Sequence, residues 1–158
     1  MKSTGTQITK SYRQINNAKP GDVFPLLCPV REQEWLDGWE HTMIFSTSGY
    51  AEKGCVFSTP HHYDVTTFWY ITEYDRIHHR VEFIRVTPDV EIVKLTICLT
   101  DNGNETTASD ITYQYTPISE SRREHLRSAA FDREFEQDMA WWEKSINHYL
   151  ATGEKLLH

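Results

Sequence analysis

Residues 131–150 read FDREFEQDMAWWEKSINHYL, a stretch with the pattern of one strongly amphipathic helix. Its apolar residues recur at intervals of three and four, which is the spacing of one face of an α-helix. A face so apolar must be buried, and we expect it to lie along a sheet, giving two layers that can enclose a cavity. The residues on this face are Phe131, Phe135, Met139, Trp142, Ile146 and either Tyr149 or Leu150.

The sequence before this helix predicts seven β-strands. Apolar and polar residues alternate there with a period of two, and β-branched and aromatic residues are frequent. The connections are short, and Asn102-Gly103 is typical of a tight hairpin turn, so we expect an antiparallel meander. The strands are expected over residues 7–15, 41–46, 54–59, 66–74, 79–86, 91–100 and 106–116.

Two short helices are expected between the first and the second strand. Asp22 can cap one of them over residues 22–27. Pro29 precedes the other, over residues 30–36, which ends near Gly38. The predicted order is therefore a strand, two short helices, six strands and a long helical region.

The ends of the C-terminal helical region also have sequence signals. Ser121 and Glu124 have the spacing of a capping box, which predicts a helix start. Asp132 can act as a second cap, so a break near Ala130 is expected. Gly153 fits the C-terminal end of the long helix.

Five segments carry a resemblance to a known family: residues 24–35, Trp39, and residues 48–52, 56–59 and 142–150. With the order of elements, they resemble the helix-grip fold of the SRPBCC superfamily, which groups START-type lipid-binding domains, birch-pollen-allergen-like proteins and polyketide cyclases. The resemblance extends over nearly the whole chain and indicates a bacterial branch. It implies an α+β fold: a seven-stranded antiparallel sheet wrapped around a long C-terminal helix. Carriers, cyclases, hydrolases and chaperone activators share this fold, so it does not determine the function.

Length and charge restrict the class of protein. The 158 residues are expected to form one domain over residues 1–158, with a flexible N-terminus over residues 1–6. The net charge of −7 argues against a nucleic-acid partner or an anionic membrane surface, since both need a basic face. No apolar run is long enough to span a bilayer and no signal-peptide core is present, so we expect a soluble cytoplasmic protein without membrane insertion.

The histidines and cysteines do not indicate a metal centre. The adjacent pairs His61-His62 and His78-His79 cannot easily hold one ion, since neighbours on a strand point to opposite faces. The chain has no HExxH or CxxC motif, and we expect neither a metal nor a cofactor. Buried, reduced thiols without disulfides are expected at Cys28, Cys55 and Cys98.

Strand parity predicts which side chains face the long helix. These side chains either fill a solid core or line a ligand-sized cavity. The inward set is Met43, Phe45, Cys55, Phe57, Trp69, Ile71, Val81, Phe83, Val93, Leu95, Ile97, Ile111, Tyr113 and Tyr115. The expected ligand-binding residues are Trp35, Trp39, Phe57, Trp69, Phe83, Tyr113, Tyr115, Met139 and Trp142.

Few polar groups are expected inside this cavity. His41 is either a core histidine or a general base. The hydroxyls of Tyr113 and Tyr115 either reach water and backbone or orient a ligand carbonyl. These three residues are the candidate catalytic groups. Arg31 and Glu34 form either a salt bridge at the rim or a clamp for a ligand head group.

The inward set contains no carboxylate, which favours binding over catalysis. We expect a cavity that binds a hydrophobic or amphipathic small molecule, lipid-like or polyketide-like. The alternatives are an enzyme of the cyclase or hydrolase type that uses the same cavity, or a protein-interaction module that uses the outer sheet face. Phe68 and Tyr70 have outward parity there, and a homodimer through this face is possible.

Overall fold

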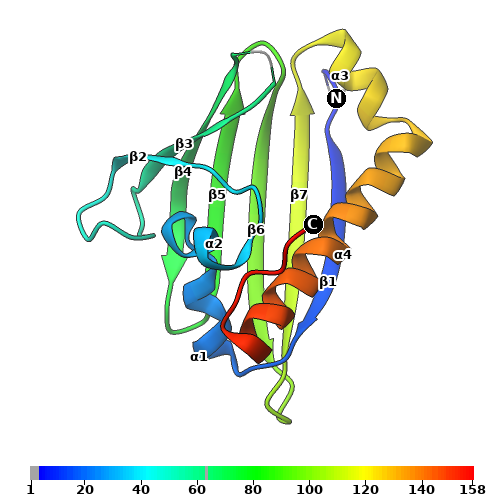
Figure 1. The fold of residues 1–158 in the computed structure, drawn as a ribbon. Helices are drawn as coiled ribbons and strands as arrows, with labels where there is room; N and C mark the ends of the chain where they lie inside the picture. The colour runs from blue at the N-terminus through cyan, green and yellow to red at the C-terminus, as the bar shows by residue number, and fades with distance from the viewer. Residues whose placement is uncertain (1–3, 63) are drawn as a thin grey trace.

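The computed structural model describes residues 4–62 and 64–158, and the expected flexible segment 1–6 lies partly outside this range. One seven-stranded antiparallel sheet forms a layer, and a long C-terminal helix, α4 (Ala129–Thr152), lies across one face of it (Figure 1). The strands follow the order β1-β7-β6-β5-β4-β3-β2, so the predicted meander is extended by β1, which pairs with β7. The predicted α+β helix-grip architecture is confirmed.

The strands begin and end within two residues of the predicted positions. On β6 buried and exposed side chains alternate, with Val93, Leu95 and Ile97 all buried on the face toward α4. The strand bounds are β1 (Ile8–Asn16), β2 (Thr42–Phe45), β3 (Val56–Pro60), β4 (Thr66–Asp75), β5 (Arg80–Thr87), β6 (Glu91–Asp101) and β7 (Thr107–Pro117).

Phe45 corrects the parity prediction. It was expected to face the helix, but 58% of its surface is exposed. The pairing of β2 with β3 is irregular between Met43 and Phe45, and such a bulge turns the following side chain to the other face. Met43 keeps its contact with the core.

Both early helices begin earlier than predicted, and the first of them is also shorter. Helix α1 (Pro20–Val23) begins at a proline, which suits the first helical position, and Asp22 lies inside its first turn instead of capping it. A 3-10 turn, η1 (Phe24–Leu26), follows, and α2 (Pro29–Trp35) again begins at a proline. Figure 1 shows these short helices beside one end of α4, where they cover the same face of the sheet.

Serine side chains cap both C-terminal helices, at other positions than predicted. Ser119, not Ser121, caps α3 (Glu120–Leu126), and Ser128, not Asp132, caps α4. Each serine hydroxyl accepts a backbone N–H three residues on, at 3.1 Å. Both serines have the extended backbone conformation that an N-cap requires, and the break between the helices lies before Ser128.

The end of α4 agrees with the prediction. Gly153 caps the helix in the left-handed conformation, with a φ of 72°. The chain then returns toward α2, where Leu156 forms a parallel bridge with Leu36 (Figure 1). His158 stacks on Trp141 with ring centroids 4.0 Å apart, so the last residues lie beside α4.

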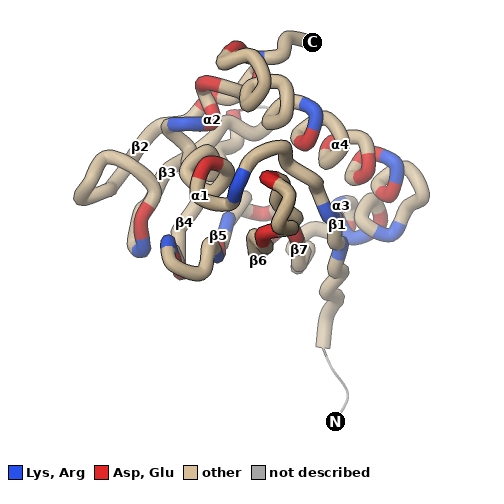
Figure 2. Tube along the Cα trace, turned by 90° about the horizontal axis from the view of Figure 1, so that it is seen from below, with Lys and Arg blue, Asp and Glu red and all other residues tan. Residues whose placement is uncertain are grey.

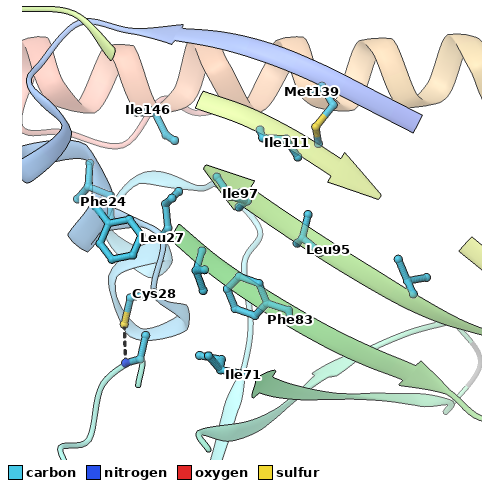
Figure 3. Close-up of a cluster of buried hydrophobic side chains, with 14 of the residues drawn as sticks. Phe24, Leu27, Cys28, Ile71, Phe83, Leu95, Ile97, Ile111, Met139 and Ile146 are labelled. Atoms are coloured by element: carbon cyan, nitrogen blue, oxygen red, sulfur yellow. Dashed lines mark hydrogen bonds between the residues drawn. The ribbon is translucent and has the colours of Figure 1, made fainter. Parts of the chain in front are cut away.

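The core lies between the sheet and the helices. Figure 3 shows Phe83, Leu95 and Ile97 from the sheet facing Met139 and Ile146 of α4. The short helices add further buried side chains, including Phe24, Leu27 and Cys28, whose sulfur accepts the backbone N–H of Ala51 at 3.3 Å (Figure 3). The expected burial of the thiols holds for Cys28 and Cys55, while Cys98 is only half-buried.

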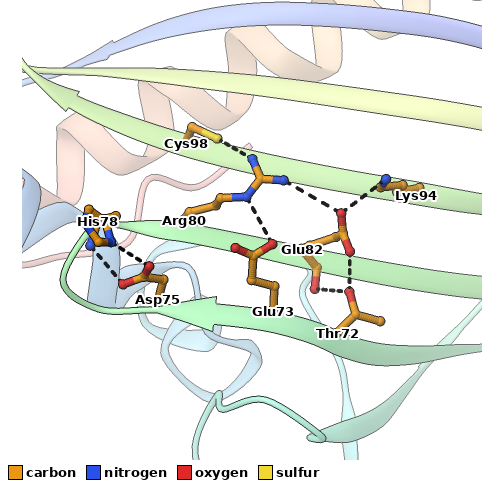
Figure 4. Close-up of polar contacts among 8 residues, drawn as sticks. All are labelled: Thr72, Glu73, Asp75, His78, Arg80, Glu82, Lys94 and Cys98. Carbon is orange, nitrogen blue, oxygen red and sulfur yellow. Dashed lines mark hydrogen bonds and ion pairs between the residues drawn. The ribbon is translucent and has the colours of Figure 1, made fainter.

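The opposite face of the sheet carries a polar network in its centre (Figure 4). Arg80 donates to Glu73 at 3.1 Å and to the sulfur of Cys98 at 3.0 Å, and it lies 3.8 Å from Glu82. Lys94 pairs with Glu82 at 3.3 Å. Cys98 is half-buried because it lies on this outer face, under the Arg80 guanidinium.

Charges of both signs are interspersed along α3 and α4 (Figure 2). This distribution accompanies the net charge of −7. Among the described residues, no helix is both long and apolar enough to cross a membrane.

Candidate functional site

A pocket of about 280 Å³ lies between the sheet, α2 and α4. Its walls are mainly apolar, and the aliphatic part includes Leu27, Leu36, Leu95 and Ile97. Most of the side chains predicted to bind a ligand meet here. Those lining the pocket are Trp39, Phe57, Trp69, Phe83, Tyr113, Met139 and Trp142.

Two of the predicted ligand-binding residues do not line this pocket. Trp35 is fully buried behind it, where its indole N–H donates to the carbonyl of Leu26 at 3.0 Å and its ring packs against Trp142. Tyr115 lines an adjoining hollow near Phe131 and stacks on Tyr113 with ring centroids 5.6 Å apart. Trp35 therefore supports the wall, and Tyr115 extends the cleft along α4.

The aromatic wall on the sheet side is built by cross-strand neighbours. Phe57 and Trp69 face each other in the β3–β4 register and stack at 5.4 Å. Phe83 on β5 meets Trp69 edge-to-face at 5.9 Å. Such contacts fix the rings, so this wall presents fixed π faces to the pocket.

Two tryptophan N–H groups of the pocket are already used inside the protein. The Trp39 indole donates to the carbonyl of Pro29 at 2.8 Å, and the Trp69 indole donates to the hydroxyl of Thr59 at 2.9 Å. These bonds orient both rings and leave their apolar surfaces for the pocket.

Glu32 brings a carboxyl group into this apolar setting. It lies on α2, lines the pocket, and is only 9% exposed. Among the described residues, no hydrogen bond or ion pair reaches its side chain. Burial without a compensating partner raises the pKa of Glu32 from 4.5 to about 8.

Arg85 and Asp138 are the other charged residues of the pocket wall. The Arg85 guanidinium lies 5.4 Å from the ring centroid of Trp69 and 3.7 Å from the buried carboxylate of Glu91. Glu91 also accepts two hydrogen bonds from Arg122, at 2.8 and 2.9 Å. Burial, and secondarily the nearby Glu134, raise the pKa of Asp138 above its usual value.

The tyrosine hydroxyls at the pocket have no protein partner among the described residues. Burial raises the pKa of Tyr113 to about 12, and it raises the pKa of Tyr115 as well. Both hydroxyls therefore keep their protons near neutral pH and can donate a hydrogen bond. The charges of Arg85, Glu32 and Asp138 all act on Tyr113, so these groups surround one region of the pocket.

His41 is not among the residues that line the pocket. Its ring stacks on Trp39 at 6.3 Å and meets Phe57 edge-on at 6.5 Å. Its Nδ1 atom is buried without a hydrogen-bond partner in the part of the chain that the structure describes, and burial lowers the pKa of the imidazole. A catalytic role for His41 stays a prediction.

The other polar candidates lie away from the pocket. Arg31 donates to Glu34 at 2.5 Å, and Glu34 also accepts from Tyr149 at 2.8 Å, so the predicted salt bridge forms on the outer side of α2. Within the described part of the chain, no group of three or more His, Cys, Asp and Glu side chains could hold a metal ion.

No family model and no curated protein matches this sequence. Solved structures match it well. Norcoclaurine synthase from Thalictrum flavum has a TM-score of 0.66 at 12% identity, over 93% of this chain and 88% of that one. The Zhui aromatase/cyclase from Streptomyces sp. R1128 has a TM-score of 0.69 at 9% identity, over 96% and 100%. Ara h 8.0201 has a TM-score of 0.68 at 10% identity, over 93% and 99%.

This chain has the helix-grip fold of these solved structures. At these identities the likeness concerns the fold. Another structure of the Thalictrum enzyme is a complex with dopamine and hydroxybenzaldehyde.

The charged residues of the helix-grip pocket were not among the ligand-binding residues predicted from the sequence, whereas Tyr113 was. The inward strand set contains no carboxylate, and the two carboxyl groups of the pocket come from helices, Glu32 from α2 and Asp138 from α4. Glu32 had a usable signal, because it lies three residues before Trp35 and therefore shares its face of α2. Arg85 continues the inward parity of Val81 and Phe83 on β5. Asp138 lies three residues after Phe135 and four before Trp142, so helical spacing places it at the edge of the apolar face of α4.

Phe68 and Tyr70 have the outward parity expected from the sequence. They are 45% and 49% exposed and lie on β4, on the face opposite α4. Their exposure leaves the homodimer contact, and the alternative of an interaction module, as predictions.

Proposed function

We propose that this protein binds a hydrophobic or amphipathic small molecule, lipid-like or polyketide-like in size and character, in the pocket between the sheet and α4. The observation that carries this proposal is a pocket of about 280 Å³ with fixed aromatic walls and a few polar groups that have no partner among the described residues. Ligand sites typically combine apolar walls with a small number of placed polar groups. A solid core would leave no such space.

The fold supports this proposal. The aromatase/cyclase and norcoclaurine synthase share the helix-grip architecture with this chain, and the latter has been solved with two small aromatic molecules. Ring stacking would give the same kind of molecule a large contact with Trp39 and Trp69 here.

A second candidate function is catalysis of the cyclase or hydrolase type in the same pocket. The observation that favours it is the joint position of Glu32 and Tyr113, two groups that hold a proton near neutral pH and line one small space. Such groups can protonate or polarise a substrate carbonyl. Loss of turnover in Glu32→Gln with unchanged affinity for a neutral apolar probe would distinguish this function from simple binding.

Native mass spectrometry with the neutral apolar probe N-phenyl-1-naphthylamine tests the proposal. We expect a complex of one probe per chain, and we expect this complex to disappear when the protein is unfolded in the ion source of the spectrometer. The same spectrum reports any co-purified small molecule and any dimer. Absence of a probe complex while the protein keeps its folded charge-state distribution would contradict the proposed function.

A further inference from the structure

Two glutamates of α2 have opposite environments. Glu34 lies on the outer side of the helix, where Arg31 and Tyr149 satisfy its carboxylate. Glu32 lies on the inner side, nine-tenths buried, and lines the pocket without a partner among the described residues. Buried carboxyls are normally paired, because an unpaired one costs several kcal/mol if it is ionised. The missing partner of Glu32 therefore points to a group that the protein itself does not supply.

The composition of the pocket wall indicates what that group is. Of the described residues that line the pocket, Glu32 and Asp138 are acidic and only Arg85 is basic, and Arg85 is paired with Glu91. Four tryptophans line the same space, and indole faces attract cations more strongly than other side chains do. The indole N–H groups of Trp39 and Trp69 are used elsewhere, whereas the indole N–H of Trp141 is buried without a hydrogen-bond partner among the described residues. The wall therefore offers hydrogen-bond donors as well as acceptors, and the features that favour a cation are its two carboxyl groups and its indole faces.

We propose that the ligand of this pocket carries a cationic nitrogen, a protonated amine or a quaternary ammonium, which pairs with the Glu32 carboxylate and contacts the tryptophan rings. This inference rests on the proposed function, because it names the chemical class of the molecule bound in that pocket. The apolar part of such a molecule would contact Phe83, Leu95 and Ile97.

Binding of a cation is coupled to a proton. In the empty pocket Glu32 holds a proton up to about pH 8. When the cation pairs with the carboxylate, this proton leaves to solvent, so the affinity rises with pH up to that value and is constant above it. The other titratable groups of the pocket wall are Tyr113, which stays neutral in this range, Asp138 from α4 and the paired Arg85 from β5.

The test compares phenyltrimethylammonium with its neutral carbon isostere tert-butylbenzene, with binding followed by tryptophan fluorescence. At about pH 8.5 we expect the cation to bind at least about tenfold more tightly than the isostere. Between about pH 8.5 and about pH 6.5 its affinity should fall about tenfold or more, while that of the isostere stays within about twofold. A quaternary ammonium does not titrate, so the change reports on the protein.

Variants assign the effect to Glu32. Glu32→Gln should remove the pH dependence and the preference for the cation, while Glu34→Gln on the outer side of α2 should change neither. Asp138→Asn should leave the pH dependence in place. If the pH dependence disappears in Asp138→Asn instead, the assignment to Glu32 is wrong.

Three outcomes would overturn the inference. Equal binding of both probes at all pH values would leave the proposed function intact and remove the cation. An affinity that falls as pH rises, and that Glu32→Gln preserves, would make Glu32 a hydrogen-bond donor to a neutral ligand. If neither probe nor N-phenyl-1-naphthylamine binds the folded protein, the proposed function fails together with the inference.

Discussion

Glu32 and Glu34 lie two residues apart on α2, yet one carboxyl group faces the pocket alone and the other is held at the surface by Arg31 and Tyr149. Pro29 starts this helix, and the side chains of Glu32 and Trp35, three residues apart, point to the same inner side. The pocket thus contains a buried carboxyl group without a partner among the described residues, while an equivalent carboxylate on the outer side of the same helix is hydrogen-bonded. This pair supplies a matched control for the experiments on the pocket.

The first prediction concerns the pH dependence of stability. Burial raises the pKa of Glu32 from 4.5 in the unfolded chain to about 8 in the folded protein, so between these values the folded protein holds a proton that the unfolded chain has lost. The free energy of unfolding therefore falls as pH rises through this range, by a few kcal/mol at most. Glu32→Gln should remove this loss, and Glu34→Gln should not. Urea unfolding at about pH 5 and about pH 9 measures it, and parallel curves for Glu32→Gln and the parent would contradict it.

The second prediction separates the supporting tryptophan from the pocket tryptophan. Trp35→Ala removes a fully buried ring and its bond to Leu26, and should cost about 3–5 kcal/mol of unfolding free energy. Trp39→Ala removes a half-buried ring that lines the pocket, and should cost less than half of that while abolishing probe binding. Chemical unfolding and probe titration of both variants test this, and equal stability losses would show that the two rings have the same role.

The third prediction concerns two glycines in different backbone conformations. Gly153 has a φ of 72°, and a side chain there is strained although nothing lies within 4 Å of its added Cβ. Gly153→Ala should therefore lower the unfolding free energy by about 1 kcal/mol. Gly21 in α1 has equally open space and no positive φ, so Gly21→Ala should be neutral or stabilising. A melting temperature that moves in the same direction in both variants would argue against this explanation.

The fourth prediction concerns the buried carboxylate of Glu91. Arg122 donates two hydrogen bonds to it, so Arg122→Gln leaves the charge poorly paired and should cost about 3 kcal/mol. The matched surface pair is Arg13 with Asp110, where Arg13→Gln should cost less than about 1 kcal/mol because both side chains are exposed. Unfolding curves decide it, and a small loss in Arg122→Gln would mean that Arg85 alone compensates Glu91.

The fold could be predicted from the sequence because its signals are periodic and local. The alternation in β6 predicted a strand and its buried face, and the spacing of Phe131, Phe135 and Met139 predicted a helix and the face that packs on the sheet. Gly153 predicted the end of the helix, because glycine readily adopts the left-handed conformation that a helix C-terminus often requires. Phe45 was assigned to the wrong face because a bulge changes the parity of a strand, and the alternation of apolar and polar residues does not reveal a bulge.

The pocket was harder to predict because charged side chains line it, and charged side chains are usually exposed. Parity brought Phe57, Trp69 and Phe83 together correctly, since these residues obey the alternation of their strands. Glu32 and Arg85 follow the same geometry, but they were not placed among the ligand-binding residues, because charged residues are seldom buried. Whether tightly packed side chains leave a space is decided by volumes that a sequence pattern does not contain.

Filling the pocket tests most directly that this space binds small molecules. Leu95 lines the pocket and Thr96, its neighbour on β6, points to the opposite face of the sheet. We predict that Leu95→Trp abolishes the fluorescence enhancement of N-phenyl-1-naphthylamine while Thr96→Trp retains it, with both variants folded by circular dichroism. Saturable probe binding that is unchanged in folded Leu95→Trp would contradict a ligand site between the sheet and α4.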